Sequence, residues 1–338
     1  MGLTYADSGV DREKRSEAKK KFKSFESTFS FSKYGKIIKT PFNTLYPISE
    51  DIFHVKTSDG VGTKVLLSEA VGKHDSIGID AVAMVVNDCI RCGARPIALT
   101  NIIDIKKSEP SLIAELQRGL QKGAELSECP LVGGETADVP ELLNTLYHIN
   151  CDCVGEVHRD EIISGERIKP GNSVIGFRSS GPHSNGISLL RRILFKKWGG
   201  CFDFFDIPDG FEKELVYYAL EPTKIYVRDF LKINKEFDVL GAVHITGDAY
   251  LKFQKITKYG FVFDNFKPHQ IFNLIKESWN IEDSEMFKTF NMGWGFAVIV
   301  NERDVDDILQ KIPYSEKIGT VAKDKGIKIL WGDRKILL

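Results

Sequence analysis

Residues 58–64 read Ser-Asp-Gly-Val-Gly-Thr-Lys, and they connect a segment with strand alternation to a segment with helical spacing. The two glycines have no Cβ atom, so the backbone can turn tightly and direct its N–H groups at an anion. Lys64 can neutralise charge and Thr63 can donate a hydrogen bond, whereas Asp59 would repel a phosphate unless Mg²⁺ lay between them. This composition suits a polyphosphate held with a metal. A tight turn with a helix-capping acid explains the same residues, and the string is not the P-loop pattern.

The segments on either side place this loop at a strand-to-helix junction. Apolar residues alternate over 51–58, which predicts a strand, and residues 65–71 continue in helical spacing. The same reasoning predicts helices over 79–91, 110–126, 186–198, 223–234 and 302–312, and strands over 96–105, 130–134, 145–157, 173–177, 239–245, 261–263, 295–300, 317–321 and 327–331. Both halves of the chain mix strands and helices in a similar order, which is typical of an α/β (α+β) protein.

Two domains are expected from the length and from one polar segment. With 338 residues, the chain exceeds the usual size of a single core. Residues 159–172 are polar and contain Gly165 and Pro170-Gly171, so they form the best candidate for a junction. We therefore expect an N-terminal domain over residues 1–158 and a C-terminal domain over residues 159–338.

The composition argues against several kinds of partner. Hydrophobic residues make up 42% of the chain and charged residues 28%, as in soluble globular proteins. A net charge of −1 gives no electrostatic basis for binding nucleic acid or an anionic membrane surface, and no apolar run is long enough to span a bilayer. Small molecules and further copies of the chain are the expected partners.

The six cysteines favour a reducing compartment. They are scattered, and no secretory signal precedes them, so a cytoplasmic location fits better than a disulfide framework. Cys89 and Cys92 have the spacing of a redox or zinc motif, but no second pair completes it and the surrounding pattern is apolar, which favours core residues. Cys151 and Cys153 alternate, so both should face one side of a strand.

Acids and amides beside the ends of other elements form a second group of candidates. Asn87 and Asp88 lie in an otherwise apolar helix, where a buried carboxylate is costly unless it is paired or bound to a cation. Glu135 follows two glycines at the end of a buried strand and should point into a crevice at that edge. An acid on a helix surface and an acid in a turn are the alternative explanations.

Residues 179–186 read Ser-Ser-Gly-Pro-His-Ser-Asn-Gly and run from a buried strand into an amphipathic helix. Backbone N–H groups at a helix N-terminus favour a phosphate, and the Ser and Asn side chains can complete its coordination, although an N-capping turn is the alternative. His183 could act as an acid or base, donate to a phosphate oxygen, or be structural. Residues 244–248, His-Ile-Thr-Gly-Asp, repeat this arrangement after another buried strand.

Taken together, these motifs resemble the phosphoribosylformylglycinamidine cyclo-ligase family, also called aminoimidazole ribonucleotide synthetases. The resemblance extends along most of the chain and is carried by Tyr5-Ala-Asp-Ser-Gly-Val-Asp11 and by residues 59–64, 74–80, 85–88, 131–137, 179–186, 244–247 and 290–293. It implies two α/β domains, with ATP bound by the N-terminal domain. It also implies a homodimer in which the N-terminal sheets of two subunits join.

The same resemblance implies an ATP- and Mg²⁺-dependent reaction of purine biosynthesis. Formylglycinamidine ribonucleotide would be phosphorylated on its formamide oxygen and closed by an internal nitrogen, giving aminoimidazole ribonucleotide, ADP and phosphate. The implied ATP-binding residues are Lys23, Asp59, Gly60, Gly62, Thr63, Lys64, Asn87 and Asp88, and the implied substrate-binding residues are Ser179, Ser180, Gly181, His183, Ser184 and Asn185. The metal candidates are Asp59, Asp88, Glu135 and Asp248, and the catalytic candidates are Lys64 and His183.

Two departures from the family pattern and two other function classes complete this interpretation. The glycine-rich segment before the first strand is reduced to residues 32–35, Ser-Lys-Tyr-Gly, and Gly247-Asp248-Ala249 replaces a turn of three glycines. One alternative is another ATP enzyme of the same superfamily that phosphorylates a different small molecule. The other is a non-catalytic nucleotide-binding scaffold, which would have no need of a cluster of acids around phosphate.

Overall fold

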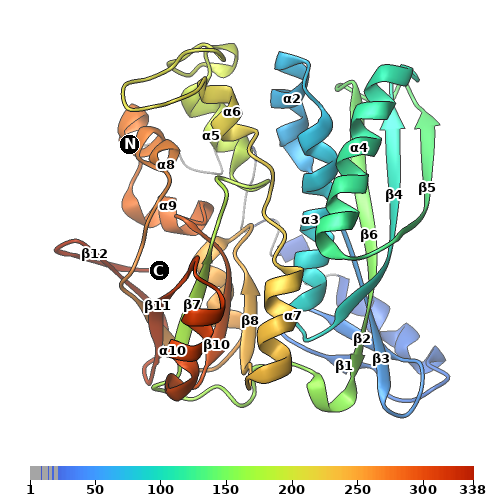
Figure 1. Cartoon of the computed structure of the whole chain (residues 1–338), viewed down its shortest axis with the longest axis vertical. Coiled ribbons are helices and arrows are strands. Elements are labelled where there is room, and N and C mark those ends of the chain that lie inside the picture. Colours follow the sequence, from blue (N-terminus) through green and yellow to red (C-terminus); the bar gives the residue numbers. More distant parts are fainter. Residues whose placement is uncertain (1–8, 10–13, 15–16, 19–21) are drawn as a thin grey trace.

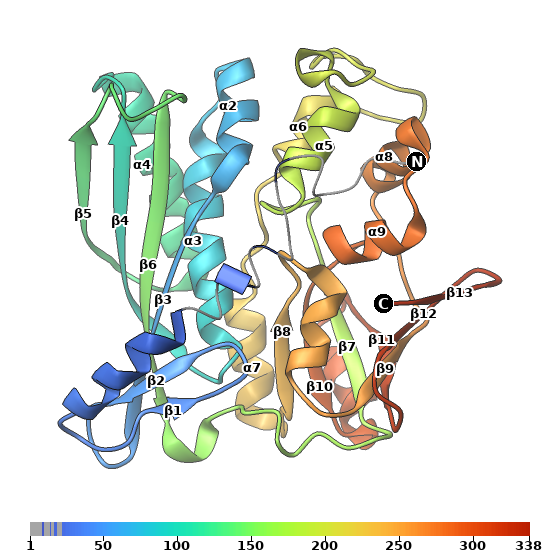
Figure 2. The same ribbon diagram turned by 180° about the vertical axis from the view of Figure 1, so that it is seen from behind.

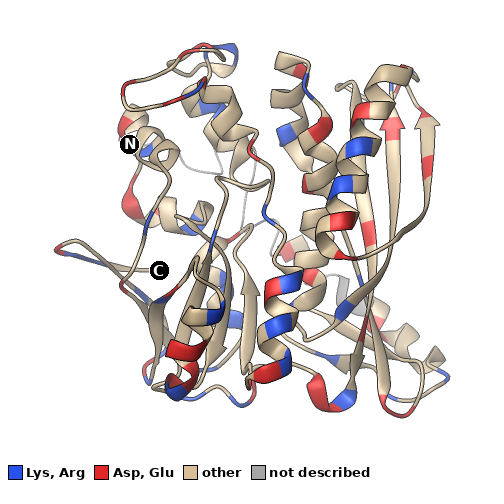
Figure 3. Cartoon of the chain, viewed as in Figure 1, with Lys and Arg blue, Asp and Glu red and all other residues tan. Residues whose placement is uncertain are grey.

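The computed structural model describes residues 9, 14, 17–18 and 22–338, and it shows two sheets with helices between and around them (Figure 1). Of the motif at residues 5–11, all but Gly9 lies outside the described residues. Lys and Arg are interspersed with Asp and Glu over both halves of the molecule (Figure 3). This distribution agrees with the near-zero net charge.

The first sheet has six strands in the order β1-β2-β3-β6-β4-β5. Its strands are β1 (Ile38–Lys39), β2 (Thr44–Pro47), β3 (Ile52–Gly60), β4 (Arg95–Ile105), β5 (Leu131–Asp138) and β6 (Tyr147–His158), and its helices are η2 (Phe22–Phe31), η3 (Gly62–Lys64), α2 (Val65–Val71), α3 (Asp75–Ile90) and α4 (Pro110–Ser127). Only β4 and β5 pair in parallel, because α4 crosses over between them. Helices α3 and α4 lie on the side of this sheet that faces the rest of the chain (Figure 1).

The core of this domain follows the predicted alternation. In β6 every second side chain is buried, including Cys151 and Cys153, and Cys89 and Cys92 are buried on and after α3. All four are free thiols, as predicted for core residues. Helices α3 and α4 touch through glycines, since a Cβ atom on Gly78 would lie 2.4 Å from the backbone nitrogen of Leu120.

The second sheet has seven strands in the order β13-β12-β9-β11-β7-β10-β8 (Figure 2). Its strands are β7 (Ser173–Arg178), β8 (Gly241–His244), β9 (Gly260–Phe263), β10 (Trp294–Val300), β11 (Ser315–Ala322), β12 (Ile327–Trp331) and β13 (Arg334–Leu337). The helices of this part are η4 (Arg159–Glu161), α5 (Ile187–Leu194), η5 (Lys196–Trp198), α6 (Leu215–Ala219), α7 (Val227–Glu236), η6 (Ala249–Lys255), α8 (Gln270–Trp279), α9 (Asp283–Thr289), η7 (Glu302–Asp304) and α10 (Val305–Lys311). Strands β9 and β12 pair in parallel, and the other neighbours are antiparallel.

The predicted class of two mixed sheet-and-helix domains is confirmed, whereas the boundary after residue 158 stays a prediction. Sequence patterns missed β1, β2, β13, α6, α8 and α9. The helix predicted from residue 223 begins only at Val227, because residues 221–226 are held in contacts with the N-terminal domain. Among the described residues, no helix combines the length and apolar character that a membrane span requires.

Candidate functional site

A cavity of about 420 Å³ opens between the two domains beside the end of β3. We call it the interdomain cavity. From the N-terminal domain it is lined by Pro41, Phe42, residues 59–62, Met84, Asp88 and Arg91, and from the C-terminal domain by Ser184, Asn185, residues 246–248, Lys252 and Lys255. The predicted phosphate loop, the acid on α3, the serine-asparagine loop and the turn after β8 thus meet at one place.

Asp59 stands at the end of β3, where that strand pairs with Cys151 of β6. Its Oδ1 accepts a hydrogen bond of 2.8 Å from the backbone nitrogen of Gly60. Burial raises the pKa of Asp59 and the nearby Asp88 carboxylate raises it further, while the Gly60 hydrogen bond and more distant cations act the other way. The cavity therefore disfavours the anionic form of Asp59 unless a cation joins it.

Asp88 lies in the last turn of α3 and is held by two partners. Its Oδ1 is 3.0 Å from Nη1 of Arg91 and accepts a hydrogen bond of 2.9 Å from Nδ1 of His244. Burial would raise the pKa of Asp88, but Arg91, His244 and Lys252 outweigh it and lower the pKa. Burial lowers the pKa of His244 to about 4 despite the Asp88 contact, so at neutral pH a neutral imidazole faces an ionised carboxylate.

Three cations that the sequence analysis did not single out line this cavity, namely Arg91, Lys252 and Lys255. Lys252, on η6, donates a hydrogen bond of 3.0 Å to the carbonyl of His244 and another to Oγ1 of Thr246. Arg91 follows α3 and pairs with Asp88. The sequence contained one signal for Lys252, which is the unusual turn Gly247-Asp248-Ala249 just before it. The sequence analysis considered Asp248 of that turn and did not consider Lys252.

The turn that carries Asp248 has an unusual backbone. Asp248 and Ala249 have φ values of +67° and +35°, in the left-handed region that glycine favours. The Asp248 carboxylate lines the interdomain cavity and lies 3.6 Å from Nζ of Lys255. Non-glycine residues in this region cost about 1 kcal/mol or more each, and such strain is concentrated at functional sites.

Lys64 lies in a buried contact between the two domains. Its side chain is completely buried, with Nζ 2.7 Å from Oδ2 of Asp80 and donating a hydrogen bond of 2.7 Å to the carbonyl of Glu221. Oδ1 of the same aspartate accepts hydrogen bonds from the backbone nitrogen and hydroxyl of Thr223. The lysine therefore joins the two domains and does not line the cavity, and its roles toward ATP and in catalysis stay predictions.

Two neighbouring candidates also contact the other domain, and their roles toward ATP stay predictions. Asn87 is fully buried, and its amide donates to the carbonyl of Lys224 at 2.8 Å and accepts from the nitrogen of Tyr226 at 2.9 Å. Both ends of that amide are thus used by the other domain. Oγ1 of Thr63 lies 2.9 Å from Oγ of Ser188 and also contacts the C-terminal domain, although Thr63 itself is exposed.

His183 is buried inside its own loop, at a φ of +61°. Its Nε2 accepts a hydrogen bond of 3.3 Å from the backbone nitrogen of Ser180. Burial holds the pKa of His183 well below its ordinary value, so the ring stays neutral and serves as an internal acceptor. A role of His183 in proton transfer or in substrate contact stays a prediction.

Only the second half of the predicted substrate loop reaches the interdomain cavity. Ser179 donates to Oδ1 of Asn291, Ser180 donates to the carbonyl of Pro222, and the carbonyl of Gly181 accepts from Asn291. These three residues hold the loop, and their substrate contacts stay predictions. Ser184 and Asn185 line the cavity, and Nδ2 of Asn185 is buried without a hydrogen-bond partner in the described part of the chain.

Glu135 lies apart from Asp59 and Asp88. It is exposed on β5, three strands away from β3, and accepts a hydrogen bond from the backbone of Thr136. Within residues 22–338 and the few others described, no group of three or more His, Cys, Asp or Glu side chains is placed to hold a metal. The predicted four-residue metal set is therefore not assembled by a single chain. Lys23 belongs to η2, but its side chain lies outside the described residues.

Comparison with known proteins identifies relatives along the whole chain. The family model for "AIR synthase related protein, N-terminal domain" matches residues 43–157, and the corresponding C-terminal model matches residues 169–332. A phosphoribosylformylglycinamidine cyclo-ligase of Pyrococcus furiosus is 42% identical over 96% of this chain and 97% of its own length. The enzyme of the same name from Methanosarcina barkeri is 36% identical over 97% of both chains.

Solved structures share the fold at much lower identity. A structure of AaThiL complexed with AMPPCP and TMP has a TM-score of 0.64 at 14% identity and covers 94% of this chain and 95% of its own. Thermotoga maritima PurL complexed with FGAR has a TM-score of 0.62 at 13% identity, covering 86% of this chain and 46% of that longer one. These likenesses confirm the architecture of two domains.

The contact between Lys64 and Asp80 predicts a loss of stability on substitution. In Lys64→Met the carboxylate of Asp80 stays buried without its cation, so we expect the free energy of unfolding to fall by about 3–5 kcal/mol. Denaturant titration would measure this fall. Lys64→Met/Asp80→Asn should recover part of it, because asparagine still accepts the hydrogen bonds from Thr223. The exposed Lys56→Met is the matched control, and equal stability of the two single variants would contradict the assignment.

Proposed function

The chain belongs to the phosphoribosylformylglycinamidine cyclo-ligase family, and we propose that its reaction takes place in the interdomain cavity. Members of this family use ATP to close formylglycinamidine ribonucleotide to aminoimidazole ribonucleotide in purine biosynthesis. This location rests on one observation. Asp59 and Asp88 of one domain line the same cavity as Asn185 of the other, and Nδ2 of Asn185 has no hydrogen-bond partner among the described residues. Acids suited to a metal-bound triphosphate and a donor suited to a substrate phosphate thus share one cavity.

We assign the nucleotide end of the cavity to Asp59, Asp88 and the backbone of residues 60–62. Carboxylate oxygens are ligands that Mg²⁺ prefers, and this ion commonly uses one or two carboxylates together with phosphates and water. The raised pKa of Asp59 supports the assignment, because burial and, to a smaller extent, the Asp88 carboxylate disfavour its charge unless a cation is added. Bound Mg²⁺ would neutralise phosphate charge there.

In this proposal, Lys252 and Lys255 supply the positive charge that faces the reacting phosphates, a role that the sequence analysis gave to Lys64. Both lysines line the cavity from the C-terminal domain, opposite Asp59 and Asp88. The ammonium of Lys252 is fixed by two acceptors, so its remaining N–H is held in position without further ordering. Fixed charge of this kind stabilises a transferring phosphoryl group better than mobile charge from solvent.

Substrate positioning is assigned to Ser184 and Asn185. Nδ2 of Asn185 and the hydroxyl of Ser184 can donate to the ribose phosphate, close to the start of α5. His183 contributes indirectly by holding the backbone of Ser180. Catalysis then depends mainly on aligning the γ-phosphate with the formamide oxygen, which requires little covalent chemistry from the protein.

We also propose the homodimer implied by the resemblance. Helices α3 and α4 cover one side of the first sheet, and β5 forms an open edge (Figure 1). Large exposed apolar side chains in and around the same sheet are Tyr46, Ile102, Val132, Leu142 and Leu146. A second copy that covered them would bury an apolar surface that is unusual for a monomer. Any role of Glu135 toward Mg²⁺–ATP would then involve the partner's cavity.

Domain roles and location complete the proposal. The ATP phosphates are assigned to the domain of residues 1–158 and the substrate phosphate to residues 159–338, with both facing the same cavity. A cytoplasmic location fits the six cysteines, all of which are free thiols.

Turnover tests the proposed reaction directly. Purified protein with formylglycinamidine ribonucleotide and Mg²⁺–ATP should release ADP and aminoimidazole ribonucleotide in equal amounts. ATP bound without hydrolysis would indicate the nucleotide-binding scaffold. ADP released only with a different acceptor would indicate another kinase-like member of the superfamily.

Substitution of Asp59 tests the metal assignment. Asp59→Asn keeps the acceptor for the Gly60 nitrogen but removes the charge, so the fold should be retained. We expect the affinity for ATP in the presence of Mg²⁺ to fall about tenfold, or ~1.4 kcal/mol. Titration calorimetry with and without Mg²⁺ would measure it, with Asp51→Asn as a control just before the start of the same strand. Unchanged Mg²⁺–ATP affinity would remove Asp59 from the site.

Lys252 should impose a pH dependence on the reaction. Burial lowers the pKa of Lys252 to about 8, with Asp88 and Asp248 opposing the shift and Arg91 and Lys255 adding to it. The ammonium is therefore lost as the pH rises through this value, and kcat/KM should fall on the alkaline side. We expect Lys252→Met to lower kcat/KM about tenfold or more at neutral pH.

The arginine variant separates charge from packing. In Lys252→Arg the guanidinium stays charged, so the alkaline fall in kcat/KM should disappear while most activity remains. A wild-type profile that is flat between about pH 7 and 9, or a Lys252→Met variant with unchanged kcat/KM, would show that Lys252 does not serve the reaction.

A further inference from the structure

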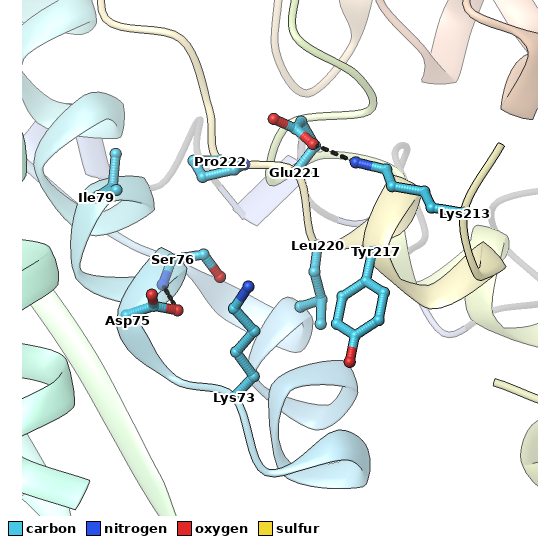
Figure 4. Close-up of a pocket in the computed structure, with 9 residues that line it drawn as sticks. All are labelled: Lys73, Asp75, Ser76, Ile79, Lys213, Tyr217, Leu220, Glu221 and Pro222. Carbon is cyan, nitrogen blue, oxygen red and sulfur yellow. Dashed lines mark hydrogen bonds and ion pairs between the residues drawn. The ribbon is translucent and has the colours of Figure 1, made fainter. Parts of the chain in front are cut away.

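A second cavity, of about 340 Å³, lies at the other end of α3 (Figure 4). It is bounded by the turn between α2 and α3 on one side and by α6 and the residues after it on the other. It shares no lining residue with the interdomain cavity, and none of the roles proposed above involves it. Its volume is within the range of sites for small organic molecules.

Much of its wall is apolar. Ile79 contributes from α3, and Tyr217 and Leu220 contribute from α6 and its C-terminal end. Figure 4 shows these side chains on different sides of the space, with the ring of Tyr217 beside Leu220. An apolar group of a ligand would lose contact with water against these side chains.

One cation at this cavity has no acidic partner. Nζ of Lys73 lies 5.4 Å from the centre of the Tyr217 ring, and no carboxylate within the described part of the chain is at ion-pair distance from it. The other lysine of the lining, Lys213, is already paired with Glu221 at 2.9 Å. Lys73 is therefore the charge available to a negatively charged ligand group.

A buried hydroxyl and a carboxylate lie at the adjoining start of α3. Ser76 is only 7% exposed, and its Oγ has no hydrogen-bond partner among the described residues. Figure 4 shows this hydroxyl directed into the space where the Lys73 side chain also points. Asp75 precedes it, and its Oδ1 accepts a hydrogen bond of 2.9 Å from the Ser76 nitrogen. A buried hydroxyl without a partner is costly, and a ligand acceptor would remove that cost.

We propose that the second cavity binds a small zwitterion with an apolar body, which is the chemistry of an α-amino acid with an apolar side chain. The carboxylate contacts Nζ of Lys73 and accepts from the hydroxyl of Ser76. The ammonium pairs with Asp75, and the side chain packs on Ile79, Tyr217 and Leu220. A phosphate is the poorer fit, because its second negative charge would face Asp75.

The location gives such a ligand a structural effect. Leu220 is followed by Glu221 and Thr223, which bind Lys64 and Asp80 in the contact between domains. A ligand in the second cavity touches α3 on one side and this segment on the other. It therefore stabilises the docked arrangement of the domains by an amount that rises with the logarithm of its free concentration once that exceeds the dissociation constant.

Binding of L-phenylalanine to the full-length protein tests this inference. We expect a dissociation constant of about 1 mM by NMR or calorimetric titration, with a matching rise in the melting temperature. Phenylacetate, which lacks the ammonium, and phenethylamine, which lacks the carboxylate, should each bind several-fold more weakly.

Three variants assign the contacts. Lys73→Met should weaken the binding of L-phenylalanine and of phenylacetate about fivefold and leave the binding of phenethylamine unchanged. Asp75→Asn should weaken the binding of L-phenylalanine and of phenethylamine and leave that of phenylacetate unchanged. Ser76→Ala should weaken the binding of both ligands that carry a carboxylate, L-phenylalanine and phenylacetate. Binding that none of the three variants changes would place the ligand elsewhere. Absence of L-phenylalanine binding at about 10 mM would overturn the proposal, because occupancy would then be negligible.

Discussion

The arrangement of this molecule depends on one ion pair that is closed off from water, between Lys64 and Asp80. Two buried charges are costly to desolvate, and their attraction compensates only when further hydrogen bonds satisfy the remaining polar atoms. Here the carbonyl of Glu221 and the nitrogen and hydroxyl of Thr223 supply those bonds. Because the acceptors and donors come from both domains, the pair is satisfied only when the domains are docked in this orientation.

That orientation determines which residues face the interdomain cavity. Asn87 binds backbone atoms of Lys224 and Tyr226 across the domain contact, and His183 binds the backbone of Ser180 within the C-terminal domain. The serine-asparagine loop then lies opposite the end of β3. Asp59 and Asp88 then share the cavity with Lys252. The opposing charges partly balance there, and Asp59 is the acid whose environment still favours an added cation.

Sequence patterns predicted the elements and the clustering of motifs better than the roles of single residues. Alternation in β3 and β6 and the glycine-bounded loop located Asp59 correctly at a strand end, and Asp88 was expected to need a partner. Lys64, Asn87 and His183 were assigned to ligands from the family resemblance and from their polar character, which is the same whether a side chain binds a ligand or holds the fold. Only tertiary contacts distinguish the two cases. Glu135 required the strand order, since β5 follows β4 in the chain but lies far from β3 in the sheet.

The glycine contact between α3 and α4 has a mechanical consequence. With Gly78 against the backbone of Leu120, and a Cβ atom on Gly119 reaching within 2.0 Å of the Asp75 carbonyl, α3 has no space to bend or slide on its neighbour. It is a rod of 16 residues, or about 24 Å, with one cavity at each end. Because the two helices interlock, a displacement at either end of α3 has to carry α4 with it, so the pair moves as one body between the two cavities.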